Sequence, residues 1–216
     1  MELHRALAQV AAIQDQVTRA DVYRGYRSVP VAASGLIGLA AAWLQPPRLD
    51  ADPIAFVIYW GVVAATAGFV GVSEIVYNYV VHDEAVARRR TRRVVGQMLP
   101  SLLAGAIIAA VFARLNTALV PLLPGIWAIC FGVGIFASRP FLVRSSGWVA
   151  LFFYAAGVAL LLNARGPDAL SPWSVGGTFG VGQLLTAALL YWNLETPRRI
   201  VSEDESSEVD DEEEES

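Results

Sequence analysis

The chain has 216 residues, 55% of them hydrophobic, and a formal net charge of −4. Its single cysteine, Cys130, excludes an intrachain disulfide and any cysteine cluster that would hold zinc or an iron–sulfur centre. Ten of its 20 acidic residues crowd between Glu203 and Glu215, so the rest of the chain carries a surplus of positive charge from 16 arginines. This separation into an apolar body and short charged segments indicates a membrane protein.

Residues 1–27 are predicted to form a cytoplasmic amphipathic helix. Apolar residues recur at alternating steps of three and four, which is the spacing of a coiled-coil seam: Leu3, Ala6, Val10, Ile13, Val17 and Ala20. The apolar side has no Trp or Phe, so binding to lipid should be weak. We expect this helix to pack on protein, either on the chain's own cytoplasmic loops or on a partner.

Six apolar stretches are long enough to cross roughly 30 Å of hydrocarbon, which takes about 20 residues of helix. They lie at about 29–45, 53–81, 97–115, 118–138, 146–164 and 174–194. Stretches such as Leu102 to Phe112 have no polar face, which suits a helix surrounded by lipid. The sequence therefore predicts an all-α integral membrane protein, with a six-helix transmembrane bundle over residues 28–197.

The arginines predict the orientation, because basic residues in short loops stay on the cytoplasmic side. Thirteen lie before the first stretch, in alternate connections or after the last stretch: Arg5, Arg19, Arg24, Arg27, Arg88, Arg89, Arg90, Arg92, Arg93, Arg139, Arg144, Arg198 and Arg199. Only Arg48, Arg114 and Arg165 lie on the other side. Both termini are therefore predicted to be cytoplasmic.

The second stretch contains one polar constellation. Glu74, Asn78 and His82 are spaced i, i+4, i+8, which places them in a stripe on one helix face. An ionisable residue in a span is a candidate ion or proton site. However, Glu74 lies roughly 32 Å along the helix from Pro53, close to the cytoplasmic boundary. A structural ion pair or hydrogen bond is therefore the other interpretation of this stripe.

The connection 82–96 is predicted to be a loop that carries five arginines, Arg88, Arg89, Arg90, Arg92 and Arg93. These side chains are candidates for contact with anionic lipid or with the acidic tail. The tail, residues 198–216, is predicted to be disordered, because it cannot bury enough apolar surface to offset its chain entropy. It either solvates the protein or folds back on the arginines.

Small and polar residues predict how the helices pack. Ser34, Gly38 and Ala42 in the first stretch, and Gly176 and Gly180 in the sixth, recur every four residues, which lets helices approach closely. Gln183 and Thr186 lie near the middle of the sixth stretch, where polar side chains usually hydrogen-bond a neighbouring helix. We expect both to make interhelical contacts.

No motif for catalysis, metal binding, nucleotide binding or nucleic-acid binding is found, so we expect no catalytic residue, no metal site, no cofactor and no nucleic-acid partner. The leading functional hypothesis is a non-enzymatic membrane component that recruits or regulates a cytoplasmic or membrane protein. The alternative is a small secondary transporter or channel that uses the Glu74, Asn78 and His82 stripe. Either protein would reside in the lipid bilayer, and homo-oligomerisation is compatible with both.

Overall fold

The computed structural model describes the backbone of residues 28–81, 85–142 and 145–195, and the side chains of residues 28–71, 73, 95–142 and 145–193. Over these ranges the chain forms six α-helices and no strand. The helices are α2 Ser28–Leu44, α3 Pro53–Val81, α4 Ala85–Leu115, α5 Leu123–Ser138, α6 Ser146–Leu162 and α7 Pro172–Leu190. The predicted helix 1–27 and the predicted tail 198–216 lie outside the described residues.

Short turns connect the helices. Segments of 3₁₀-helix cover Pro47–Asp50, Thr117–Leu122 and Arg139–Phe141. A π-helical turn, Tyr191–Glu195, continues α7. Connections this short force successive helices to run antiparallel and side by side.

Proline and an oxygen-bearing side chain set the start of α3 and of α7. Pro53 occupies the first position of α3, and the carboxylate of Asp52 accepts hydrogen bonds from the backbone N–H groups of Ile54 and Ala55, both at 3.1 Å. At α7, Pro172 follows Ser171, whose hydroxyl accepts from the N–H of Trp173 at 3.4 Å. The backbone N–H groups in the first turn of a helix have no partner within the helix. Proline has no such N–H, and the capping oxygen accepts a hydrogen bond from another of these groups.

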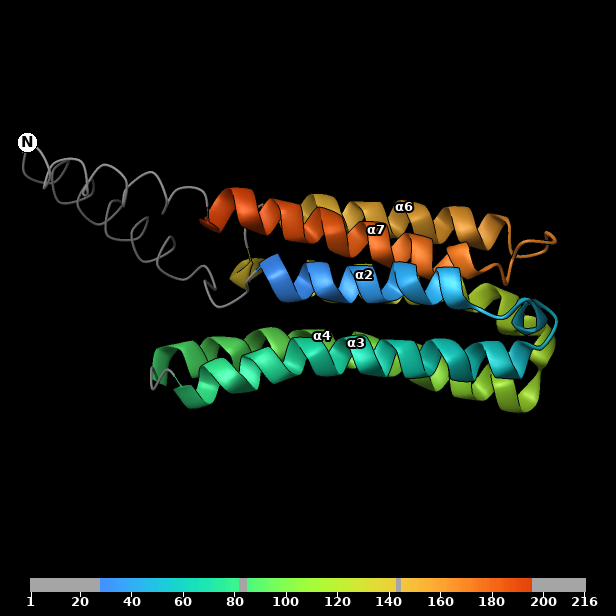
Figure 1. Ribbon diagram of the computed structural model, residues 1–216, viewed down its shortest axis with the longest axis horizontal. Helices are drawn as coiled ribbons and strands as arrows, with labels where there is room; N and C mark the ends of the chain where they lie inside the picture. The colour runs from blue at the N-terminus through green and yellow to red at the C-terminus, as the bar shows by residue number, and fades with distance from the viewer. Residues whose placement is uncertain (1–27, 82–84, 143–144, 196–216) are drawn as a thin grey trace, which may run out of the picture.

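The helices lie nearly along one axis, with α2, α6 and α7 above α3 and α4 in the view of Figure 1. The most extensive contacts are between α2 and α7 and between α5 and α6, followed by α4 with α5 and α2 with α3. At one end of the bundle α2, α4 and α6 begin while α3, α5 and α7 end (Figure 1). We call this the arginine end, because Arg88–Arg93 and Arg139 lie there.

Four helical segments are long and apolar enough to cross a bilayer: Pro53–Gly71, Val95–Leu115, Thr117–Phe141 and Pro172–Asn193. The two remaining helices, Ser28–Leu44 and Ser146–Leu162, are also apolar but have only 17 residues each. The described part of the chain is thus all-helical, with at least four helices built for a hydrocarbon environment.

The prediction of a loop over 82–96 is wrong from Ala85 onward. Helix α4 begins at Ala85, so the backbone of Arg88–Arg93 is helical and continuous with the apolar part of the same helix. The physical reason is propensity, because alanine and arginine are strong helix formers and no glycine or proline interrupts the chain between Ala85 and Val95. Pro100 lies inside α4, where membrane helices tolerate proline.

Candidate functional site

The contact between α2 and α7 is formed by glycines that face one another, and we call it the glycine seam: Gly35 and Gly38 on α2, Gly176 and Gly180 on α7. A Cβ atom placed on Gly176 would lie 2.6 Å from the carbonyl oxygen of Gly38 and 2.5 Å from the Cβ of Ala42. A Cβ on Gly35 would lie 3.0 Å from the carbonyl oxygen of Gly180. The two backbones are therefore in direct contact, as the small-residue spacing predicted for Gly38, Ala42, Gly176 and Gly180.

Ser34, the remaining member of the predicted small-residue set, hydrogen-bonds within its own helix. Its hydroxyl donates to the carbonyl oxygen of Val31 at 2.7 Å. The residue that joins the seam instead is Gly35, one position further along α2. A one-residue shift corresponds to about 100° of rotation around the helix, which the spacing alone did not resolve.

A second close contact joins α5 to α6. A Cβ on Gly125 would lie 2.7 Å from the carbonyl oxygen of Gly157, and one on Gly157 would lie 2.9 Å from that of Gly125. No four-residue repeat of small residues marks these two positions in the sequence, so this contact was not predicted. It becomes visible only once the helices are placed side by side.

An aromatic cluster joins the two glycine-packed pairs. The ring of Phe131 on α5 lies 4.9 Å from that of Phe153 on α6 and 5.4 Å from that of Phe179 on α7. Phe153 is fully buried, and Gly182 on α7 leaves the space that its ring occupies. Edge and tilted arrangements of this kind are the favourable geometries for aromatic pairs.

A polar clamp holds α3 to the rest of the bundle at the end opposite the arginine end. The amide oxygen of Gln45 accepts from the indole N–H of Trp60 at 2.8 Å, and its nitrogen donates to Asp50 at 2.7 Å and to the carbonyl of Leu170 at 3.5 Å. Gln45 and Trp60 are both buried. Since every hydrogen-bonding group of this amide is engaged inside the protein, its role is structural.

Away from that clamp, α3 and α4 are poorly covered. In the spanning segments of α3 and α4 11% of the residues are buried, against 44% in the segment containing α5 and 39% in that of α7. No described atom lies within 4 Å of a Cβ placed on Gly61, Gly68 or Gly71 of α3. We call the exposed positions Gly61, Ala64, Ala65 and Gly68 the small face of α3.

Large apolar side chains are also exposed on this hairpin. Val62 is 60% exposed and Phe69 is 74% exposed on α3, and Ile107 is 62% exposed on α4. In water an apolar surface of this extent would be strongly unfavourable, so lipid or another apolar helix must cover it. The α3–α4 hairpin is the part of the described bundle that offers the most uncovered surface.

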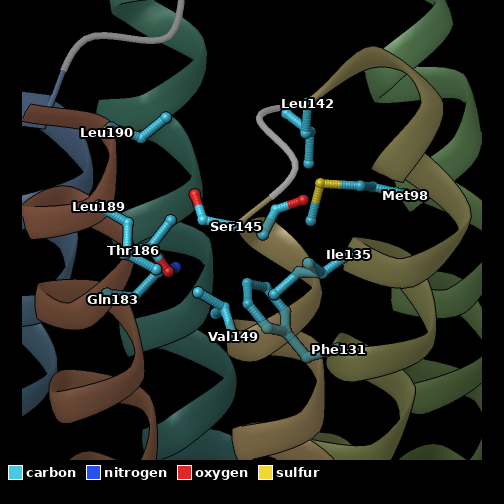
Figure 2. Close-up of a pocket in the computed structure, with 11 residues that line it drawn as sticks. Met98, Phe131, Ile135, Leu142, Ser145, Val149, Gln183, Thr186, Leu189 and Leu190 are labelled. Carbon is cyan, nitrogen blue, oxygen red and sulfur yellow. The ribbon is translucent and has the colours of Figure 1, made fainter. Parts of the chain in front are cut away.

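A small cavity of about 40 Å³ lies between α4, α5, α6 and α7 near the arginine end. Figure 2 shows Gln183 and Thr186 of α7 facing Phe131 and Ile135 of α5 and Met98 of α4 across it. The polar side chains that line it are those of Ser145, Ser146, Gln183 and Thr186, and none of the described residues around it is ionisable. In the described part of the chain, no group of three or more His, Cys, Asp or Glu residues could hold a metal ion.

The structure gives Gln183 and Thr186 different environments. The Thr186 hydroxyl donates to the carbonyl oxygen of Gly182 in its own helix at 2.7 Å, rather than to a neighbouring helix. The Cβ of Gln183 lies against Gly35 of α2, while its amide lines the cavity. The interhelical hydrogen bonds expected of these two residues are not among those formed between described residues.

The other predicted site residues are only partly described. The backbone of Glu74 and Asn78 belongs to the last turns of α3, and the backbone of the five arginines from Arg88 to Arg93 belongs to the first turns of α4. Their side chains, and all of His82, lie outside what the structure describes. The stripe and the arginine contacts therefore stay predictions.

Comparison of the chain with protein-family models, with curated proteins and with solved structures finds no match. What can be said of its class follows from the helices. Four segments long and apolar enough to cross a bilayer, together with apolar surface facing outward, define a multi-pass integral membrane protein.

Proposed function

We propose that this protein is a non-enzymatic, six-span membrane component that binds another membrane protein through the small face of α3. The observation that carries the proposal is the difference between glycines in one bundle. The glycines of the seam meet a neighbouring backbone, whereas Gly61 and Gly68 meet no described atom within 4 Å. Small residues in membrane helices are typical of positions where a second helix approaches closely.

The six-span topology rests on α2 and α6, the two helices outside the four spanning segments. α2 packs along α7 through the glycine seam, and α6 packs along α5, which belongs to the spanning segment Thr117–Phe141, so each lies beside a segment long enough to span. A helix of 17 residues is roughly 26 Å long, at the short end of what crosses a bilayer. Helices that lie in register with spanning neighbours and have no charged residue inside them are best accommodated in the same hydrocarbon layer.

The cytoplasmic placement of both termini rests on the arginines. The connections between α3 and α4 and between α5 and α6 share the arginine end with the start of α2 and the end of α7 (Figure 1). Positive charge in short loops favours the cytoplasmic side. The same orientation would hold the helical start of α4, with its five arginines, at the cytoplasmic surface near anionic headgroups.

A transmembrane partner fits the small face better than lipid alone does. Gly61, Ala64, Ala65 and Gly68 recur at steps of three and four, so they form one continuous shallow strip about two turns long. Lipid chains contact large and small residues alike, but only another helix gains from bringing its backbone against such a strip. The partner is therefore a transmembrane helix, supplied either by a different protein or by a second copy of this chain.

The transport alternative needs polar groups from several spans around one passage. The polar side chains that line the cavity at the arginine end come from the start of α6 and from α7, and none of its described lining residues is ionisable. The described helices pack instead through glycine and aromatic contacts. Packing of this kind favours the hypothesis of a non-enzymatic membrane component over the transport alternative.

Photo-crosslinking in native membranes tests the proposal. A benzophenone amino acid at Ala64 should give discrete protein adducts, because Ala64 lies on the small face. The matched control is Val62, which is also exposed but lies about 160° away from Ala64 around α3. Mass spectrometry of the adducts distinguishes a second copy from a different protein.

A substitution completes the test. Gly68→Leu would fill the strip, and the Ala64 adducts should then decrease severalfold while the protein stays folded. If Ala64 and Val62 give the same adducts, or if Gly68→Leu leaves the Ala64 adducts unchanged, the small face is not a binding surface and the proposal fails.

A further inference from the structure

The cavity near the arginine end contains hydrogen-bonding groups that have no partner in the described protein. The hydroxyl oxygen of Ser146 is buried and makes no hydrogen bond. No hydrogen bond joins the amide of Gln183 to any other described residue, although this side chain lines the same cavity. Buried polar groups in folded proteins are almost always satisfied, by protein atoms or by ordered water. Gln183 is half-buried, so the cavity is lined by one buried unpaired hydroxyl and one unpaired amide, and together they point to an occupant.

The size and chemistry of the cavity restrict that occupant. A water molecule needs a cavity of roughly 10–15 Å³ on this measure, together with two to four polar partners. The cavity measures about 40 Å³ and offers Ser146, Gln183 and the oxygen atoms of Ser145 and Thr186. Among the described residues, no ionisable side chain lines it to balance a charged ligand. A lipid chain would contact the apolar walls formed by Phe131 and Ile135 but would leave the serine and the amide unpaired.

We propose that this cavity is a water-binding site, in which ordered water bridges the hydroxyl of Ser146 on α6 and the amide of Gln183 on α7. Water can donate to one of these groups and accept from the other, since a serine hydroxyl and a primary amide each have both capacities. Apart from the hydroxyls of Ser145 and Thr186, the remaining lining is apolar, so the polar groups are the ones that hold the water in place.

The position of this site gives the water a structural consequence. α6 and α7 pack on each other less extensively than α2 packs on α7 or α5 on α6. The aromatic cluster of Phe131, Phe153 and Phe179 joins them in the middle of the bundle. Toward the arginine end the cavity lies between α6 and α7, where the amide of Asn193 donates to the hydroxyl of Ser145 at 3.3 Å. Bound water adds a second polar link there between the two glycine-packed pairs.

Hydroxyl-radical footprinting of the full chain in lipid nanodiscs tests this inference. Radiolysis converts bound water into radicals that label the nearest side chains. Phe131 lines the cavity, whereas Phe153, in the same aromatic cluster, is fully buried and does not line it. We expect Phe131 to be labelled severalfold faster than Phe153. Equal labelling of the two rings would overturn the proposal.

Two substitutions distinguish cavity water from water that reaches Phe131 by another route. Gln183→Leu combined with Ser146→Ala removes both polar partners, and labelling of Phe131 should fall to the rate of Phe153. Gln97→Leu makes the same change at an exposed position of α4 outside the cavity and should leave the labelling unchanged. Labelling of Phe131 that persists in the double variant contradicts the proposal.

Ser146→Ala alone decides the question if the double variant does not fold. It removes one oxygen atom and no apolar contact, so the bundle should elute as the unmodified protein does. A decrease in Phe131 labelling in this variant supports bridging water, and unchanged labelling overturns it.

Discussion

The glycine seam and the small face of α3 consist of the same kinds of residue at the same kinds of spacing, yet they differ in what covers them. At Gly176 a methyl group would collide with the backbone of α2, whereas at Gly68 it would meet no described atom. The seam is completed within the chain, and the small face is left open on the membrane side. A small-residue pattern therefore indicates that a helix can be approached closely, but not which helix approaches it.

The strongest test of this difference is to introduce the same side chain into the glycine seam and into the small face. Gly176→Val should destabilise the protein by about 3 kcal/mol, because the backbones of α2 and α7 must separate to make room for the valine side chain. Gly68→Val in the isolated protein should change stability by less than about 0.5 kcal/mol. Unfolding in mixed detergent micelles measures both. Equal losses would mean that the two surfaces are packed alike.

The clamp at Gln45 tests how the open hairpin is attached to the packed part. Gln45→Leu leaves the indole N–H of Trp60 and the carboxylate of Asp50 without their amide partner, with an expected cost of about 1–2 kcal/mol. Hydrogen exchange should rise in residues 53–60 of α3 and stay unchanged in α7. An increase spread evenly over the bundle would contradict a local role of the clamp.

A smaller effect is expected at the start of the same helix. Asp52→Ala removes the acceptor of two backbone N–H groups in the first turn of α3, a loss of about 1 kcal/mol. Asp52→Asn retains a side-chain oxygen and should recover most of that stability. Thermal unfolding of the three proteins is the measurement, and an equal loss in both variants would argue for a charge effect instead of capping.

A further small effect is expected at Glu74, near the arginine end of the open hairpin. Since this position lies close to the membrane boundary, Glu74→Gln should change stability by less than about 1 kcal/mol. The proposed function also predicts no proton flux above that of empty liposomes, in either the unmodified protein or the variant. Flux by the unmodified protein that disappears in a folded Glu74→Gln variant would favour the transporter hypothesis instead.

Sequence reasoning identified helices and several of their contact residues, but it misjudged the connection between α3 and α4. The segment predicted as a loop over 82–96 is helical from Ala85. A cluster of charge does not by itself indicate a loop, because arginine favours helix. The predicted contacts of Gly38 and Gly176 were found, whereas Thr186 hydrogen-bonds its own helix. A threonine hydroxyl reaches the carbonyl four residues earlier as readily as a neighbouring helix, so spacing alone does not decide between them.

By itself, the sequence determined that the chain is helical and suited to a membrane, because backbone groups in hydrocarbon must be hydrogen-bonded within the helix and long apolar segments leave no other solvent. It also predicted the sidedness of the charge, because successive spans place alternate connections at the same end and thirteen of the 16 arginines lie on that side. Only the tertiary structure decided which glycines meet. The contact of Gly125 with Gly157, the hydrogen bond from Trp60 to Gln45 and the cavity beside Gln183 each bring together residues from different elements of the fold. Such contacts depend on how each helix is rotated about its axis, and that rotation is set by the packing of the whole bundle rather than by any local pattern.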